Sequence, residues 1–401
     1  MCSQPLKILF VTSRLPSHLK TGDRLRAYRF IEGLIQQGHQ VDLLAFESPG
    51  STPETEIYSI CHAVYPISLH DLEFHYQSKL KQVKDMLVGA YQGFPRRVWQ
   101  FHSDAMQNTF AQLLAQTHYD VVHYSEIGVA ELAIRFKDNL PSVRIFDLID
   151  AVSLSVRSSL THRFDISWPA RLIEAYTLRR FETKLLDVVD AGIVVSLRDK
   201  AYLTDKSNLH VIPMGIHVPA TISSNKKEFD LIFVGNMSVK PNIDAIHWFV
   251  HSVLPHIWAK RPGTTLYIVG RDPVPSVRQL ANHCIKVTGS VPDTNWYINR
   301  AKVFVAPLRI GAGQKIKLLE AFANAVPVVA TQEANQGTGA QNGHSIILQD
   351  APHKMAESII NLLEDEKLRL TIGENGFKFV QENFTWERAV TLLNDLYRQA
   401  M

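Results

Sequence analysis

Short apolar runs alternate with longer amphipathic stretches through the first half of the chain. Runs rich in branched side chains, which are typical of buried parallel strands, occupy residues 7–13, 39–46, 119–125, 143–150 and 191–196. Between the first two runs, apolar residues recur at helical spacing from 24 to 37, and Gly38 ends that pattern. Helical patterns also cover 70–118 and about 167–188. The strand, helix, strand order predicts βαβ units and hence a parallel α/β domain.

The pattern restarts after a polar, aperiodic segment at 219–228, which is the best candidate for a linker. Five further strands are predicted at 229–236, 264–271, 285–291, 301–308 and 327–331, with helices at 242–260, 315–324, 354–365 and 385–401. We therefore predict two Rossmann-like α/β domains that face each other across a cleft. The expected boundaries are an N-terminal domain at 1–215, a linker at 216–228, a C-terminal domain at 229–382, and a helix at 383–401 that packs back on the N-terminal domain.

Composition limits the function classes. The chain has 401 residues, 46% of them hydrophobic and 20% charged, as in a globular protein of about two domains. A net charge of +3 is spread along the sequence, so nucleic acid is not an expected partner. Three cysteines (Cys2, Cys61 and Cys284) form no CxxC pair, and the 17 histidines contain no HExxH motif. A disulfide framework and a structural zinc site are therefore not expected.

The N-terminal apolar stretch is too short for a signal peptide, and no run approaches the roughly 20 apolar residues that span a bilayer. We therefore expect a soluble, cytoplasmic protein. Basic residues in the segment 95–99 and between Arg171 and Arg180 could contact anionic lipid at the inner face of the plasma membrane, or they could simply be solvated helix faces.

Ligands of open parallel sheets bind beyond the carboxyl ends of the strands. Small and polar residues follow the predicted strands at these positions: Gly22, Gly235, Asn236, Gly270, Arg271, Gly289, Ser290, Arg309, Gly311 and Gly313.

The segment 305–329 is the most informative of these strand ends. Its glycines let the backbone approach a ligand, and a helix that begins near Lys315 offers free N–H groups to phosphate. Arg309 and Lys317 can add positive charge, and Glu320 lies on the same helix face as Lys317, where its carboxylate could accept hydrogen bonds from ribose hydroxyls. An ordinary βα turn with a surface Lys–Glu pair is the alternative interpretation.

The sequence "GAGQKIKLLEAFANAVPVVAT", together with "FVGNMSVKPNIDAIHWF", "LYIVGRDP" and "VTGSVPD", resembles family 4 glycosyltransferases, and in particular the sugar transferases of exopolysaccharide-type biosynthesis. The resemblance covers nearly the whole chain and is more specific in the second half. It implies a GT-B fold, a nucleotide-sugar donor such as a UDP-sugar, and transfer of a hexose with retention of configuration to a hydroxyl acceptor, which is a lipid-linked glycan, a polysaccharide or a small molecule.

The resemblance also implies roles for single residues. Arg309 and Lys317 would hold the diphosphate, and Glu320 would bind ribose. Other donor-binding positions would be Gly22, Gly235, Asn236, Gly289, Ser290, Val291, Gly311 and Gly313. The chain departs from the family at three positions: Ala312 replaces a glutamate, Asn236 replaces an arginine, and Gln336 replaces a glutamate.

Catalysis is expected to need neither a metal nor another cofactor, because no DxD motif is placed for a divalent cation and side-chain cations would take its place. Asp150, at the end of a first-half strand, is the candidate that orients or deprotonates the acceptor, with a helix N-cap as its alternative role. Asp147 lies within the strand and is expected to be structural. Glu126 follows another strand end, where it could face the cleft, but a plain surface carboxylate is the expected role there.

Other functions remain open on the sequence alone. Epimerases and phosphorylases share the predicted architecture, although no lysine is marked for pyridoxal phosphate. A dinucleotide oxidoreductase would require a GxGxxG turn after the first strand, which is absent. A nucleotide-sugar-binding protein without transferase activity is the remaining alternative.

Overall fold

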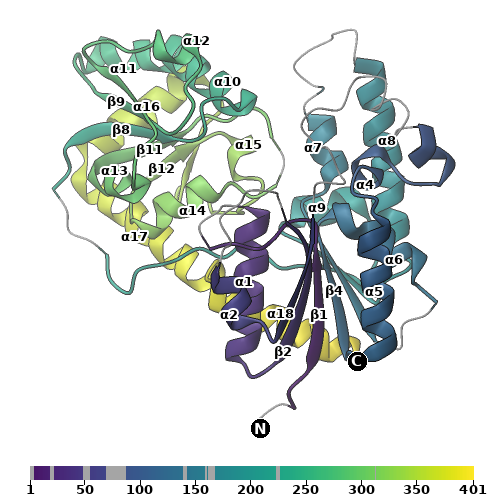
Figure 1. Ribbon diagram of the computed structural model, residues 1–401. Helices are drawn as coiled ribbons and strands as arrows, with labels where there is room; N and C mark the ends of the chain where they lie inside the picture. The colour runs from purple at the N-terminus through teal and green to yellow at the C-terminus, as the bar shows by residue number, and fades with distance from the viewer. Residues whose placement is uncertain are drawn as a thin grey trace. The chain divides into compact units, whose positions relative to one another are not determined.

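The computed structural model describes residues 4–18, 22–47, 55–68, 87–138, 142–158, 160, 168–222, 226–311 and 313–401 (Figure 1). The chain divides into two compact units. The first comprises Met1–Gly215 with Trp386–Met401, and the second comprises Ile216–Thr385. Each unit is built on its own sheet, and the two are described separately below.

The first unit contains a seven-stranded parallel sheet in the order β3-β2-β1-β4-β5-β6-β7. Its strands are β1 (Lys7–Thr12), β2 (Gln40–Glu47), β3 (Ala63–Ser68), β4 (Val121–Ser125), β5 (Val143–Ile149), β6 (Ala191–Val194) and β7 (Leu209–Val211). The central strands are buried almost throughout, because helices cover both faces of the sheet. The order reverses between β1 and β4, and this reversal makes a topological switch point there.

The helices of the first unit include α1 (Asp23–Gln36), α2 (Thr55–Ile60), α4 (Arg96–Trp99), α5 (Asp104–Gln116), α6 (Ala130–Arg135), α7 (Val152–Ser158), α8 (Trp168–Leu185), α9 (Leu197–Leu203) and α18 (Trp386–Ala400), with a 3₁₀ turn η2 at Ile127–Val129. Most of these helices fall where the apolar periodicity predicts them. Within the long helical pattern expected at 70–118, residues 69–86 lie outside the described residues, whereas 87–91, α4 and α5 are helical.

The C-terminal helix α18 packs on α1 of the first unit, which confirms the prediction. A Cβ atom added to Gly33 of α1 would lie 2.5 Å from a methyl group of Val390, so only glycine permits this close approach. The hydroxyl of Tyr397 on α18 lies 2.8 Å from Nδ1 of His123 in the sheet, and both side chains are buried. The last helix is therefore part of the core of the first unit.

The second unit contains a six-stranded parallel sheet in the order β10-β9-β8-β11-β12-β13. Its strands are β8 (Phe229–Val234), β9 (Leu266–Val269), β10 (Ile285–Gly289), β11 (Ala301–Ala306), β12 (Val328–Ala330) and β13 (Ile347–Leu348). Both sheets are thus Rossmann-like, as predicted. In this sheet the order reverses between β8 and β11.

The helices of the second unit are α10 (Lys240–Trp248), α11 (Leu254–Lys260), α12 (Pro275–Arg278), α13 (Thr294–Arg300), α14 (Ile316–Ala323), α15 (Gln332–Asn335), α16 (Pro352–Glu364) and α17 (Glu366–Asn383). A π-helical segment, η3 (Phe249–Val253), joins α10 to α11. The single helix predicted at 242–260 is therefore present, with a local widening in its middle.

Candidate functional site

The carboxyl edge of the second sheet carries most of the predicted site residues. The loop after β8 begins with Gly235, and the loop after β11 runs from 307 to 315. These two strands are neighbours at the point where the strand order reverses. A ligand of an open α/β sheet binds at such a switch point, so the two loops are placed to contact one ligand together.

Lys317 lies at the centre of this edge. Its Nζ donates a hydrogen bond to Oδ1 of Asn242 at 2.7 Å, and Nδ2 of Asn242 donates to the carbonyl of Asn236 at 2.8 Å. A Cβ atom added to Gly235 would lie only 2.8 Å from the Lys317 ammonium. The lysine from α14 thus reaches the backbone that follows β8, and glycine at 235 leaves the space it needs.

Burial lowers the pKa of Lys317 to about 7, and neighbouring Lys315 adds to that effect. Burial also raises the pKa of Glu320 to about 7, while the charge of Lys317 opposes that rise. An anion bound beside a lysine whose pKa is lowered in this way stabilises the charged form of the lysine. Perturbed groups of this kind at a strand edge are typical of functional sites.

The glycine-rich loop leads into the N-terminus of α14. Gly311 has a φ of 142° and Gly313 a φ of 68°, which are conformations that favour glycine. A Cβ atom added to Gly337 would lie 2.4 Å from the Gly313 carbonyl oxygen. Glycine at 337 therefore allows the two loops to approach each other closely. Lys315, the N-cap residue of α14, has no acceptor in its side chain to cap the helix. The first N–H groups of α14 are therefore suited to an anion. Ala312 lies outside the described residues.

Arg309 is held in a way that the sequence did not indicate. Its Nη2 and Nε donate to the two carboxylate oxygens of Asp244 at 2.6 and 3.0 Å, and its guanidinium lies 5.5 Å from the centroid of the Trp248 ring. Both partners come from α10, which follows the Gly235 loop. The arginine is exposed. A diphosphate could therefore bind its guanidinium together with Asp244 or in place of Asp244.

The ends of β8, β9 and β10 lie close together through their backbones. A Cβ atom added to Gly270, after β9, would be 1.9 Å from the Gly235 carbonyl oxygen, and the Gly270 N–H donates to the Gly289 carbonyl at 3.2 Å. Gly289 has a φ of 72°, Ser290 is exposed and Val291 is half-buried. The predicted donor-binding residues Gly289, Ser290 and Val291 therefore line the same sheet edge as Lys317.

In the first unit, Gly22 is the N-cap of α1 with a φ of 71°, and its carbonyl accepts the first helical hydrogen bond from Arg26. Arg26 itself is fully buried and donates to Asp147 at 2.6 Å and to backbone carbonyls that follow β7. Asp147 is thus structural, as expected from its place within the strand.

Asp150 follows β5 and is half-buried. Ile149, the last residue of β5, has a φ of 65°, which is unusual for a β-branched side chain and turns the chain sharply at the sheet edge. The N–H of the next residue, Ala151, donates to buried Asp199 at 3.1 Å. A fixed turn therefore precedes α7 at the position of Asp150.

Glu126 has an environment that sequence reasoning missed. Its carboxylate accepts hydrogen bonds from the hydroxyls of Ser13 and Thr12 at the end of β1, and its own φ is 71°. Burial, and next the charge of Asp23 on α1, raise its pKa to about 8. Glu126 is therefore protonated near neutral pH, which is not the state of a plain surface carboxylate. The pairing of β1 with β4 creates this environment.

No group of three or more His, Cys, Asp or Glu residues within the described ranges could hold a metal ion. Of the helices that the structure describes, none is long and apolar enough to span a bilayer.

Two parallel sheets, each with a reversal at its centre and a helix C-terminal to the second sheet that returns to the first unit, define a GT-B fold. A solved structure agrees: HepE from Anabaena in complex with UDP superposes with a TM-score of 0.66 at 16% identity, over 98% of this chain and all of the other.

Two family models then match the sequence. "Glycosyltransferase Family 4" matches residues 25–218, and "Glycosyl transferases group 1" matches residues 228–365. The chain belongs to this family of glycosyltransferases, which confirms the resemblance.

Two curated relatives align with part of the chain. An uncharacterized 44.6 kDa protein in the cps region of Klebsiella pneumoniae is 27% identical over 188 residues, which are 42% of this chain and 47% of that protein. This alignment spans about half of the relative's length. A GDP-mannose-dependent phosphatidylinositol monomannoside mannosyltransferase of Mycobacterium tuberculosis is 23% identical over 266 residues, covering 59% of this chain and 68% of the relative.

Proposed function

We propose that this protein is a retaining glycosyltransferase that moves a hexose-type sugar from a nucleotide diphosphate sugar to a hydroxyl acceptor. The observation that carries the proposal is Lys317, a half-buried lysine with a lowered pKa that lies beside Gly235 in the first turn of α14. A diphosphate supplies the negatively charged partner that such a lysine lacks. The UDP bound by HepE and the GDP-mannose used by the mycobacterial relative are both ligands of this chemistry.

In the proposed reaction, the bond between the anomeric carbon and the diphosphate oxygen breaks while the acceptor oxygen bonds to the same face of the sugar. Lys317, the N–H groups of α14 and Arg309 stabilise the negative charge that develops on the diphosphate. Asp150 orients the acceptor hydroxyl, and the proton of that hydroxyl passes to Asp150 or to the departing diphosphate oxygen. Retention is inferred from the family.

Donor binding is assigned to the same sheet edge. Glu320 accepts hydrogen bonds from the ribose hydroxyls, and the backbones at Gly235 and Asn236 lie beside the diphosphate or the sugar. The nucleobase lies along Gly289, Ser290 and Val291, and Gly311 and Gly313 let the loop approach the diphosphate. Gly22, at the N-terminus of α1, stays a donor-binding residue on the resemblance to the family.

A thermal-shift screen with UDP, GDP, ADP, TDP and their common sugars identifies the nucleotide, because a ligand far above its dissociation constant stabilises the fold by a few kcal/mol. Calorimetry then compares Lys317→Ala with a control, Lys367→Ala, which removes an exposed lysine of α17. Loss of a desolvated charge partner costs about 2 kcal/mol or more, so Lys317→Ala should weaken binding of the nucleotide diphosphate by about 30-fold or more, whereas the control should match the parent.

Equal affinity in both variants would remove the role of Lys317. Tight nucleotide binding without transfer to any hydroxyl acceptor would instead favour the alternative, a nucleotide-sugar-binding protein or an epimerase of the same fold.

A further inference from the structure

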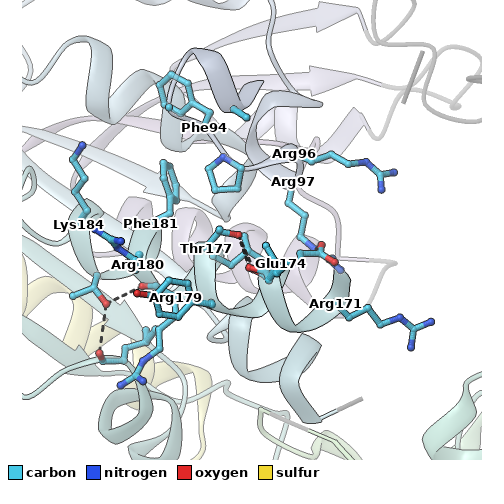
Figure 2. Close-up of a pocket in the computed structure, with 18 of the residues that line it drawn as sticks. Phe94, Arg96, Arg97, Arg171, Glu174, Thr177, Arg179, Arg180, Phe181 and Lys184 are labelled. Carbon is cyan, nitrogen blue, oxygen red and sulfur yellow. Dashed lines mark hydrogen bonds and ion pairs between the residues drawn. The ribbon is translucent and has the colours of Figure 1, made fainter. Parts of the chain in front are cut away.

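A pocket of about 1220 Å³ opens on the first unit between residues 87–97 and helix α8 (Figure 2). Its floor is formed by buried apolar side chains, among them Phe94, Leu178 and Phe181. The pocket lies within the first unit alone, and none of the site residues assigned above lines it.

The rim of this pocket exposes large apolar side chains. Among the residues that line the pocket, Ile173 is 63% exposed, and Leu87 and Tyr176 are each 62% exposed. Helix α8 already buries Ala175, Leu178 and Phe181 against the protein, so its apolar residues occupy two faces. The outer face contributes nothing to the core of the unit, and exposed apolar residues gathered around a cavity mark an interaction surface.

Positive charge surrounds the same apolar residues. Exposed cations line the pocket at Arg96, Arg97, Arg179, Arg180 and Lys184, and Figure 2 shows Arg96, Arg97 and Arg171 on one side of it. Among the described residues that line the pocket, two are acidic: Glu174 pairs with Arg97 at 2.8 Å, and Asp187 pairs with Lys206 outside the pocket. The surface therefore keeps a net positive charge.

We propose that this surface docks on an anionic lipid bilayer. The aromatic and aliphatic rim enters the boundary between headgroups and acyl chains, the pocket receives an acyl chain, and the arginines contact lipid phosphates. A second copy of the chain fits less well, because it would bring like charges together. The inference extends the proposed function. It rests on that function in one respect, which is that a lipid-linked acceptor would be presented at this surface.

Vesicle sedimentation of the full chain tests the proposal. Vesicles of phosphatidylglycerol and phosphatidylcholine in equal parts should bind the protein in low salt, and pure phosphatidylcholine vesicles should bind it far less. Each basic residue near an anionic surface contributes about fivefold to partitioning. The variant Arg96→Gln/Arg180→Gln should therefore bind about 25-fold more weakly, and Ile173→Ser about tenfold more weakly.

The matched control is Lys354→Gln/Lys367→Gln, which removes two exposed lysines of the second unit and should bind vesicles as the parent does. Nucleotide affinity, measured without lipid, checks that each variant is folded. Equal binding to both kinds of vesicle, binding to neither, or no loss in the pocket variants would overturn the proposal. A lipid-free dimer that Ile173→Ser dissociates would also overturn it and assign the surface to a second copy. Because these assays need no turnover, their outcome is independent of whether sugar transfer occurs.

Discussion

Replacing Glu126 by glutamine should stabilise the protein at neutral and alkaline pH. In the folded protein this carboxyl has a pKa of about 8, against an ordinary value of 4.5. Above pH 4.5 the unfolded chain has lost the proton that the folded chain still holds, so folding takes up a proton and stability falls as pH rises toward 8. Above pH 8 both states are ionised and the loss is complete. Glutamine removes this dependence.

The pKa difference also gives the magnitude. One pKa unit corresponds to about 1.4 kcal/mol, so the rise to about 8 sets a ceiling of about 5 kcal/mol. Solvent near the half-buried side chain and the interaction with Asp23 reduce this ceiling. We expect a gain of about 1–2 kcal/mol at pH 8.5, or roughly 2–8 °C in the melting temperature, and little change at pH 4.5.

Thermal unfolding of the parent and of Glu126→Gln across this pH range measures the difference. The exposed Glu357 on α16 supplies the control variant, Glu357→Gln, which should follow the parent at every pH. The gap between Glu126→Gln and the parent should widen steadily from pH 5 to 8. A gap that is constant with pH, or that closes as pH rises, would show that Glu126 is ionised in the folded protein and that its assigned environment is wrong.

Three further outcomes are expected. Affinity for a nucleotide diphosphate should fall as pH rises above about 7, because Lys317 then loses its charge in the free protein; calorimetry from pH 6 to 9 measures this. Gly270→Ala should cost about 2–4 kcal/mol in unfolding experiments, since the new Cβ would lie 1.9 Å from a backbone oxygen, whereas Gly263→Ala, which has a positive φ but open space, should cost about 1 kcal/mol. Tyr397→Phe should cost about 1–3 kcal/mol in the same assay, because it leaves the ring nitrogen of His123 without its partner.

Hydrophobic patterning predicted the central strands of both sheets because parallel strands are buried on both faces and therefore appear as continuous apolar runs. Of the edge strands, β10 was predicted at 285–291, whereas β3, β7 and β13 were missed. Strand β3 is half-exposed and contains Pro66, and β13 has only two residues, so neither produces such a run.

The part of the candidate site that lies at the ends of strands could be predicted from the sequence. Lys317 and Glu320 follow from a glycine-rich loop before a helix, a local signal. Asn242 and Asp244, which hold Lys317 and Arg309, lie 75 and 65 residues away from them in sequence, and periodicity places both only on a helix. The contact between Glu126 and Ser13 spans 113 residues and depends on which strands are neighbours, which no local pattern specifies.

The two cations of the second unit prepare for a ligand in different ways. Arg309 is exposed and already neutralised by Asp244 in a bidentate pair, so an incoming diphosphate gains from it only by competing with a carboxylate. Lys317 has a neutral amide as its hydrogen-bond partner and a lowered pKa. The same diphosphate would therefore supply a negative charge beside Lys317 that its hydrogen-bond partner in the protein does not provide. Interactions that strengthen as negative charge builds on the leaving group accelerate the reaction, whereas those already satisfied in the free protein contribute less. Lys317 is therefore expected to dominate transition-state stabilisation, with Arg309 contributing mainly to orientation of the donor.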